Sequence, residues 1–256
     1  MPKAKEINED KIKQEFLLIK ANNPHKTLFP NNKNGGAGNT LETLLKVKEN
    51  NKKDADYENF EVKALRTISS ANISLSSKVP TQFAQADDYL WRNFGNVNAQ
   101  GLRRFYPTLV ASGRWTVVYK KNLMRLELLR KEKKVKLLVA DLNKKVLLDT
   151  IFWSFDDVYA STKKLGDMFL TECTEKKINN VAHFSYNSAH IFWNFNFDNF
   201  LNELELGNIV LDFRCGVYKD EKRFGRMHDR GPAWRLRKNI WKDIMTRVTS
   251  KYIYIN

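Results

Sequence analysis

The sequence predicts a mixed α/β fold built as two lobes. Helical periodicity and strand-like alternation of apolar residues take turns along the chain, which is typical of a mixed α/β protein. Hydrophobic residues make up 42% of the 256 positions, enough to bury a sizeable core. No linker-like stretch divides the chain sharply. A soft boundary between the lobes is expected within residues 120–150, which gives lobes of residues 1–135 and 136–256.

The first elements expected are two helices. Residues 9–21 follow a helical period, with Asn8 as the N-cap. One face of this helix carries its apolar residues, Ile12, Phe16 and Ile19. A polar, glycine-rich stretch follows, and Asn39 is expected to begin the second helix. Its core face would hold Leu41, Leu44 and Leu45.

Strands dominate the middle of the chain. Residues 60–66 alternate, with Phe60 and Val62 on one face and Glu61 and Lys63 on the other. Another strand is expected over residues 73–79, ended by a proline. A run of four antiparallel strands comes next: residues 114–119, 123–129, 136–141 and 145–148.

The last third mixes both kinds of element. Helical patterns cover residues 155–170, 191–204 and 236–248. Strands are expected over residues 209–217 and 252–255, and the basic segment 219–227 reads as a loop.

The composition favours a polyanionic partner. Lysine and arginine number 44 against 29 acidic residues, which gives a formal charge of +15. A protein with this charge is attracted to nucleic acid, and a membrane surface is the alternative partner. Cys173 and Cys215 form no CxxC pair, which argues against a zinc site made of thiolates and fits reduced thiols in a cytoplasm. The first ten residues are charged and lack the apolar core of a signal peptide, so a cytoplasmic protein is expected.

One segment carries the pattern acid, short gap, Glu-x-Lys: Asp56-x4-Glu61-x-Lys63. Glu61 and Lys63 leave the same face of a strand, and Asp56 can curl over the end of that strand to meet them. Two carboxylates facing one point suit a hard cation such as Mg²⁺, and a lysine beside it can orient or deprotonate a water. The alternative is an ordinary solvated strand face.

Glu42 has two interpretations. As the third residue after Asn39 it could complete a capping box; otherwise it adds a further acid to the metal site. A phosphate-binding P-loop is excluded in this glycine-rich segment because no Gly-Lys-Ser/Thr follows.

The motifs occur in a characteristic order. They are Gly35-Gly36-Ala37-Gly38-Asn39-Thr40-Leu41-Glu42, Asp56-x4-Glu61-x-Lys63, Phe152-Trp153-Ser154-Phe155-Asp156, Tyr186-Asn187-Ser188-Ala189, Leu211-Asp212-Phe213-Arg214-x-Gly216 and His228-Asp229-Arg230-Gly231-Pro232-Ala233-Trp234-Arg235. Together they resemble the MvaI and BcnI group of type II restriction endonucleases, relatives of the mismatch-repair nickase MutH. Arg230 and Pro232 depart from that group, which often has histidine and threonine there.

The resemblance implies a restriction-endonuclease-like (MutH-type) core, a mixed sheet flanked by helices, with two lobes around a DNA cleft. It implies a bacterial, cytoplasmic, monomeric enzyme that needs no protein partner and no membrane. The activity would be Mg²⁺-dependent hydrolysis of double-stranded DNA, with one or two ions, at a short GC-rich site (GCGC or CCWGG-like). Residues 1–135 would form the catalytic lobe and residues 136–256 the DNA-recognition lobe.

Carried over by position, the catalytic set is Glu42, Asp56, Glu61 and Lys63, of which the three acids would hold metal. The DNA-binding set is Asp212, Arg214, Lys219, Lys222, His228, Arg230 and Arg235. Independently, arginine pairs with guanine O6 and N7, aspartate accepts from cytosine N4, and loop lysines suit phosphates. An internal salt bridge or a solvated hairpin would explain the same residues without any contact to DNA. Two other functions also stay open: a nicking repair enzyme and a non-catalytic DNA-binding protein.

Overall fold

The computed structural model describes residues 4–32, 35–47, 55–83 and 85–256. The chain forms two compact units, each assembled from separate stretches of sequence. Unit 1 comprises Met1–Ala71, Lys163–Asn196 and Lys242–Asn256, and unit 2 comprises Asn72–Thr162 and Phe197–Trp241. A single boundary between residues 135 and 136 does not follow these units, because it would cut through strand β9 (Lys134–Ala140). No described helix has the length and apolar character needed to cross a membrane.

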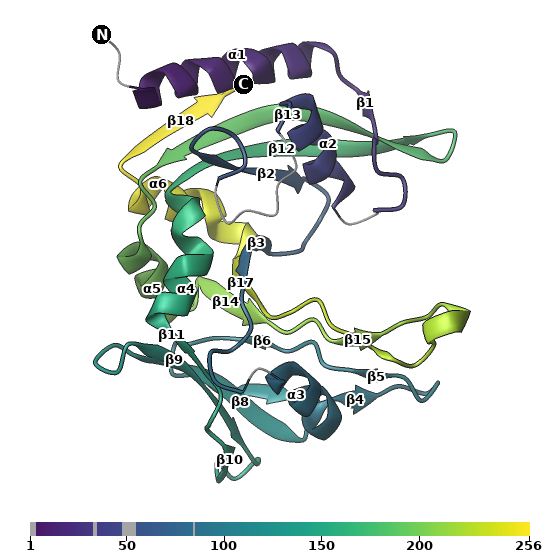
Figure 1. Ribbon diagram of the computed structural model, residues 1–256, viewed down its shortest axis with the longest axis vertical. Coiled ribbons are helices and arrows are strands. Elements are labelled where there is room, and N and C mark those ends of the chain that lie inside the picture. Colours follow the sequence, from purple (N-terminus) through teal and green to yellow (C-terminus); the bar gives the residue numbers. More distant parts are fainter. Residues whose placement is uncertain (1–3, 33–34, 48–54, 84) are drawn as a thin grey trace. The chain divides into compact units, whose positions relative to one another are not determined.

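Unit 1 is built on a five-stranded sheet (Figure 1). Its centre is the long antiparallel hairpin of β12 (Asp167–Ile178) and β13 (Val181–Trp193). Strand β2 (Phe60–Arg66) runs parallel to β12, while β1 (His25–Lys26) and β18 (Lys251–Ile255) pair with β13. Asn179 and Asn180 turn the hairpin with φ values of 49° and 62°, the left-handed conformation that asparagine tolerates well.

This hairpin corrects the helices expected over residues 155–170 and 191–204. Helix α4 (Phe155–Thr162) and the 3₁₀ turn η1 (Lys163–Gly166) are followed by β12, whose Met168, Phe169 and Leu170 are all buried. A short apolar run buried on both faces cannot be distinguished from a helix by periodicity alone. Over residues 191–204, strand β13 continues to Trp193, and helix α5 (Phe197–Glu205) begins only after it.

Two helices complete the core of unit 1. Helix α1 (Ala4–Ala21) begins before residue 9, so Asn8 lies inside the helix, where its amide donates to Asn59 at 2.9 Å instead of acting as an N-cap. Helix α2 (Gly36–Leu44) also begins before Asn39. The core combines both helices with the sheet, and its fully buried members include Ile12, Phe16, Leu41, Phe60, Phe169, Tyr186 and Ile191. Helix α6 (Trp241–Val248) leads into β18.

Unit 2 contains two larger sheets. One has the order β10-β9-β8-β7, from β7 (Thr116–Val118), β8 (Asn122–Leu129), β9 and β10 (Val146–Leu148), with β11 (Phe152–Ser154) also on β9. All pairs are antiparallel, as the sequence predicts for this region. The other sheet has the order β3-β17-β14-β6, from β3 (Ile73–Ser77), β17 (Ala233–Leu236), β14 (Ile209–Asp212) and β6 (Thr108–Leu109).

The remaining elements of unit 2 are short. Helix α3 (Ala86–Phe94) precedes the pair β4 (Asn96–Val97) and β5 (Arg103–Arg104), and β15 (Gly216–Val217) pairs with β16 (Met227–His228). The 3₁₀ turns η2 (Glu221–Arg223) and η3 (Lys238–Ile240) flank β17 in sequence. The strand expected over residues 209–217 is therefore two strands, and the helix expected from residue 236 begins at Trp241. An aromatic core supports these elements, with Trp153 contacting Phe213 and Trp234 at ring centroids 6.5 and 5.7 Å apart.

Candidate functional site

Strand β2 brings together three residues of the predicted catalytic set. Phe60 and Val62 face the core, so Glu61 and Lys63 project from the opposite face, as the alternation predicts. The ammonium of Lys63 donates to Oε1 of Glu61. Asp56 reaches the same strand from the preceding segment, where its Oδ2 accepts from the backbone N–H of Val62 at 3.1 Å. This bond holds the Asp56 carboxylate over the beginning of β2.

Lys164 adds a residue to this site that the sequence does not reveal. Its Nζ lies 2.8 Å from Oε1 of Glu61, so two ammonium groups meet on one carboxylate oxygen. Lys164 belongs to η1, which directly precedes the strand that pairs with β2. Sequence patterns gave no signal for it, because the residue lies far from β2 in the chain and within a segment expected to be helical.

Glu42 joins this group from helix α2. The capping-box interpretation is wrong, because the helix begins at Gly36 and Asn39 lies within it; the backbone oxygen of Asn39 accepts from Thr43 at 2.8 Å. Burial raises the pKa of Glu42, and the charges of Asp56 and Glu61 raise it further, against the opposing effect of Lys63 and Lys164. The carboxyl of Glu42 is therefore within electrostatic range of the other four side chains. We call these five residues, Glu42, Asp56, Glu61, Lys63 and Lys164, the carboxylate cluster.

The acids of the carboxylate cluster have pKa values shifted in opposite directions. Burial raises the pKa of Asp56, and Glu61 adds to this effect. Burial also raises the pKa of Glu61, but Lys63 and Lys164 together outweigh it and leave that pKa below its usual value. Glu61 is thus a fully buried, ionised carboxylate, and the two acids beside it are harder to ionise than acids in water.

Residues of the carboxylate cluster fit a hard divalent cation. Oε2 of Glu61 is buried and has no hydrogen-bond partner among the residues described. Leaving such an oxygen unpaired is unfavourable, and a cation would satisfy it. The donor set is entirely oxygen, which Mg²⁺ prefers, and positive charge would relieve the repulsion that raises the pKa values of Glu42 and Asp56.

The predicted DNA-binding residues lie in unit 2, and three of them are held by internal contacts. Arg235 pairs with Asp212 at 3.1 Å across the β14–β17 pair. Asp212 and Arg214 do not share a strand face, because β14 ends at Asp212. Instead, Nε of Arg214 donates to the backbone oxygen of Gly231 at 2.9 Å, and its Nη2 donates to that of Arg230 at 2.6 Å. Arg214 thereby braces the segment that carries Arg230.

Several of the predicted DNA-binding residues line a pocket in unit 2. Four of them, Arg214, Lys219, His228 and Arg230, line a pocket of about 470 Å³ together with Tyr106, Val217 and Tyr218. Tyr218 stacks on His228 with ring centroids 4.3 Å apart, and the guanidinium of Arg223 lies 3.8 Å from the Tyr218 ring centroid. Lys222 is exposed in η2. The pocket therefore combines stacked rings with several cations, which suits an anionic, aromatic ligand such as a nucleotide.

The fold defines the class of protein. The structure is similar to the solved structure titled restriction endonuclease MvaI–cognate DNA substrate complex, with a TM-score of 0.84 and 24% identity over 96% of this chain and 98% of that chain. It is also similar to restriction endonuclease MvaI in the absence of DNA, with a TM-score of 0.59 and 23% identity over 97% and 98% of the two chains. The chain has the restriction-endonuclease fold.

A family profile makes the assignment more specific. The profile of the MvaI/BcnI restriction endonuclease family matches residues 13–245, and the chain belongs to this family. No curated protein matches the sequence. The fold class and the family indicated by the order of the motifs are both confirmed.

Proposed function

We propose that this chain is a Mg²⁺-dependent type II restriction endonuclease that hydrolyses phosphodiester bonds at a short specific site in double-stranded DNA. The observation that carries the proposal is the carboxylate cluster. Lys63 and Lys164 both contact Glu61, and Asp56 is hydrogen-bonded to the backbone of the same strand. The charges of Asp56 and Glu61 also act on Glu42 from helix α2. Membership of a restriction endonuclease family supports the same chemistry.

Within the carboxylate cluster, Asp56 and Glu61 would hold the metal, with Glu42 as a further ligand. Bound Mg²⁺ would polarise the scissile phosphate and lower the pKa of a bound water. Lys63 would orient the attacking water through its N–H donors. Lys164 is a positioning residue in this scheme, because its contact with Glu61 keeps that carboxylate ionised and directed into the site.

Unit 2 would read the DNA. Lys219 and Lys222 are exposed on the loop between β15 and β16, a position suited to phosphate contacts that are independent of sequence. Asp212, Arg214, His228, Arg230 and Arg235 would approach base edges. Arginine favours guanine and aspartate accepts from cytosine N4, which supports a GC-rich site such as GCGC or a CCWGG-like sequence. MvaI, solved with its cognate DNA substrate, supports duplex DNA as the ligand.

We further propose that the enzyme acts as a monomer in the bacterial cytoplasm, without a protein partner. Cys173 and Cys215 are both free and buried, which agrees with a reducing compartment.

The test is to incubate the purified chain alone with plasmid DNA of known sequence, with Mg²⁺ or with a chelator. Discrete linear fragments with Mg²⁺ and none with chelator are expected, and sequencing the ends would give the site. Glu61→Gln should abolish cleavage, whereas the exposed Glu58→Gln should cleave normally, since its pair with Lys11 is a surface contact. Persistent nicked circles would identify a MutH-like nickase instead. Specific retention of DNA without cleavage in any divalent ion would identify a binding protein.

A further inference from the structure

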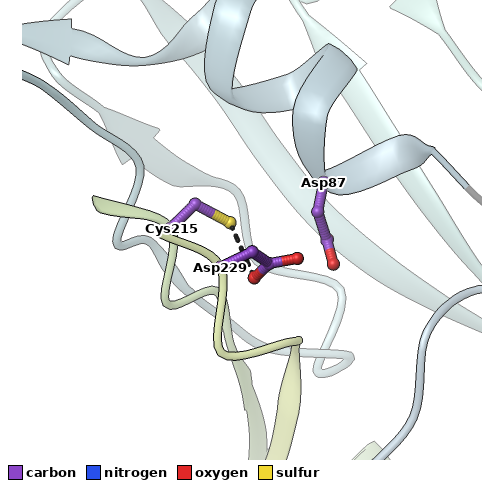
Figure 2. A group of neighbouring side chains, drawn as sticks. All are labelled: Asp87, Cys215 and Asp229. Carbon is purple, nitrogen blue, oxygen red and sulfur yellow. Dashed lines mark hydrogen bonds between the residues drawn. The ribbon is translucent and has the colours of Figure 1, made fainter. Parts of the chain in front are cut away.

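Three side chains of unit 2, outside the carboxylate cluster, converge from three segments (Figure 2). Asp87 lies in the first turn of α3, Cys215 directly precedes β15, and Asp229 follows β16. One carboxylate or thiol atom of each lies within 4.8 Å of the others. Among the described residues, these are the three metal-ligating side chains whose ligand atoms all lie this close to one another. The three acids Glu42, Asp56 and Glu61 are not all within that distance of one another.

The buried carboxyl of Asp87 points into this group, and one of its two oxygens lacks a hydrogen-bond partner among the described residues. Its side chain is directed toward Asp229 (Figure 2), the residue is 5% exposed, and its Oδ1 has no hydrogen-bond partner among the described residues. Burial raises the pKa of Asp87 to about 8, and the carboxylate of Asp229 contributes, with Arg214 opposing. Two acids brought together at a buried position are unfavourable unless a proton or a cation lies between them.

The thiol completes a set of mixed ligands. Cys215 is fully buried, and its Sγ lies 3.4 Å from Oδ1 of Asp229. Two ligands of a tetrahedral zinc ion, with bonds of about 2.3 Å to sulfur and 2.0 Å to oxygen, are separated by about 3.5 Å. The existing spacing of sulfur and oxygen therefore needs little change to accept such an ion.

We propose that Asp87, Cys215 and Asp229 form a binding site for one divalent transition-metal ion, of which zinc fits best. A thiolate with two carboxylates excludes Mg²⁺ and Ca²⁺, which prefer oxygen ligands alone, while zinc accepts all three donors. A water would take the fourth position. Binding requires the thiolate, so Cys215 gives its proton to solvent as the metal–sulfur bond forms, and the affinity rises with pH.

The position of the site suggests what the ion would do. Cys215 is adjacent to Arg214, and Asp229 lies between His228 and Arg230. Oδ1 of Asp229 also accepts from the backbone N–H of Gly231 at 2.7 Å. The ion would tie this segment to the first turn of α3 and so fix residues that line the 470 Å³ pocket. This role in DNA reading rests on the proposed function, whereas metal binding itself does not.

The proposal is tested by adding Co²⁺ to the full chain after treatment with chelator. We expect one equivalent to produce a sulfur-to-cobalt charge-transfer band in the near ultraviolet, and one equivalent of Zn²⁺ to remove it while excess Mg²⁺ does not. The band should be lost in Cys215→Ser and strongly weakened in Asp87→Asn and Asp229→Asn. Cys173→Ser is the matched control, because Cys173 is the other free, buried cysteine and belongs to unit 1.

Circular dichroism of each variant establishes that it is folded, and Asp229→Asn at an exposed position keeps the test valid if Cys215→Ser does not fold. A folded wild type without a charge-transfer band, or a band that disappears in Cys173→Ser and persists in Cys215→Ser, would overturn the proposal. Glu61→Gln separates the two sites: it should leave the cobalt band intact even though it abolishes cleavage. In the wild type, an intact band without any cleavage of DNA would count against the nuclease and not against the metal site.

Discussion

Lys164 and Lys63 share one oxygen of Glu61, although one lysine lies on η1 and the other on β2. The side chain of Glu61 is 1% exposed, so its charge is almost entirely removed from water. An ionised carboxylate at such a position requires compensating charge. Both lysines are partly exposed, Lys63 at 22% and Lys164 at 27%, so the cations that compensate Glu61 remain in contact with solvent.

Replacing Lys164 should destabilise unit 1. Lys164→Met keeps the aliphatic stem but removes one of the two cations at Glu61, and a lost hydrogen bond to a buried charged group costs on the order of 1–3 kcal/mol. The adjacent, exposed Lys163→Met is the control and should change stability little. Urea unfolding measures both. In the background of Glu61→Gln the effect of Lys164→Met should shrink; an undiminished effect would mean that Lys164 acts through other contacts.

Replacing Lys63 should separate binding from cleavage. Lys63→Ala removes the N–H donors proposed to orient the water but leaves untouched the residues of unit 2 that are proposed to bind DNA. We expect retention of specific DNA in a mobility-shift assay and a loss of cleavage of at least about a hundredfold. The exposed Lys177→Ala, on β12 of the same sheet, is the control for loss of one positive charge. Full activity of Lys63→Ala would remove this residue from the mechanism.

Arg214→Lys tests whether the shape of the guanidinium matters more than its charge. Lysine keeps the charge but cannot donate at once to the backbone oxygens of Arg230 and Gly231 and to Ser77, as Arg214 does. Binding to the cognate site should weaken by on the order of 1–3 kcal/mol, with relaxed discrimination at one base pair. Binding to random DNA should change little. Equal weakening on both DNAs would contradict a reading role.

Lys222 should behave differently because it is exposed on the loop proposed to meet phosphates. Lys222→Ala should weaken cognate and random DNA alike. The slope of log Kobs against log salt should fall in magnitude by about 1, since one fewer counterion is released. Titrations at several salt concentrations measure it. An unchanged slope would place Lys222 away from the DNA.

Acid should destabilise unit 1 through His190. This residue is 1% exposed; its Nε2 lies 3.3 Å from Glu172 and its Nδ1 lies 3.0 Å from the hydroxyl of Tyr252. Burial lowers the pKa of His190 from the ordinary value of 6.5, and the nearby Glu172 only partly opposes this. The folded protein therefore binds fewer protons than the unfolded chain below about pH 6.5, so stability falls as the pH falls through that range.

The measurement is the change in Tm between pH 8 and pH 5.5. His190→Asn removes the titrating ring, so its Tm should fall less over this interval than that of the wild type. Glu172 contributes at lower pH, since Lys242 and His190 outweigh burial and lower its pKa from 4.5, and its stabilisation is lost on further acidification. Equal falls in wild type and His190→Asn would show that His190 does not set the dependence on pH.

Local patterns predicted the part of the site that is local in sequence. Glu61 and Lys63 are two residues apart on one strand, and alternation alone places them on one face. Lys164 and the Asp87, Cys215 and Asp229 group depend on contacts between distant segments, and periodicity has no information about these. CxxC spacing is a local signal of a thiolate site, whereas a single cysteine beside two acids from distant segments leaves no such spacing in the sequence.

The fold shows the same division. The β7–β10 strands follow one another and pair with near neighbours, and they were predicted with small errors at their ends. The β12–β13 hairpin was missed although Asn179-Asn180 is a recognisable turn pair, because the apolar runs at its far ends resemble helices. Helix α3 was not predicted; it has nine residues, and its first turn places the acidic Asp87 at a buried position.

The chain passes between its units four times, after residues 71, 162, 196 and 241. Cutting at any one of these points therefore yields no fragment that contains unit 1 whole, and unit 2 can be isolated only by joining two separated stretches. During synthesis, unit 2 has all its residues once Trp241 has emerged, whereas the sheet beneath the carboxylate cluster still awaits β18. The order of emergence from the ribosome thus makes the unit that carries the carboxylate cluster the last part of this protein able to reach its native form.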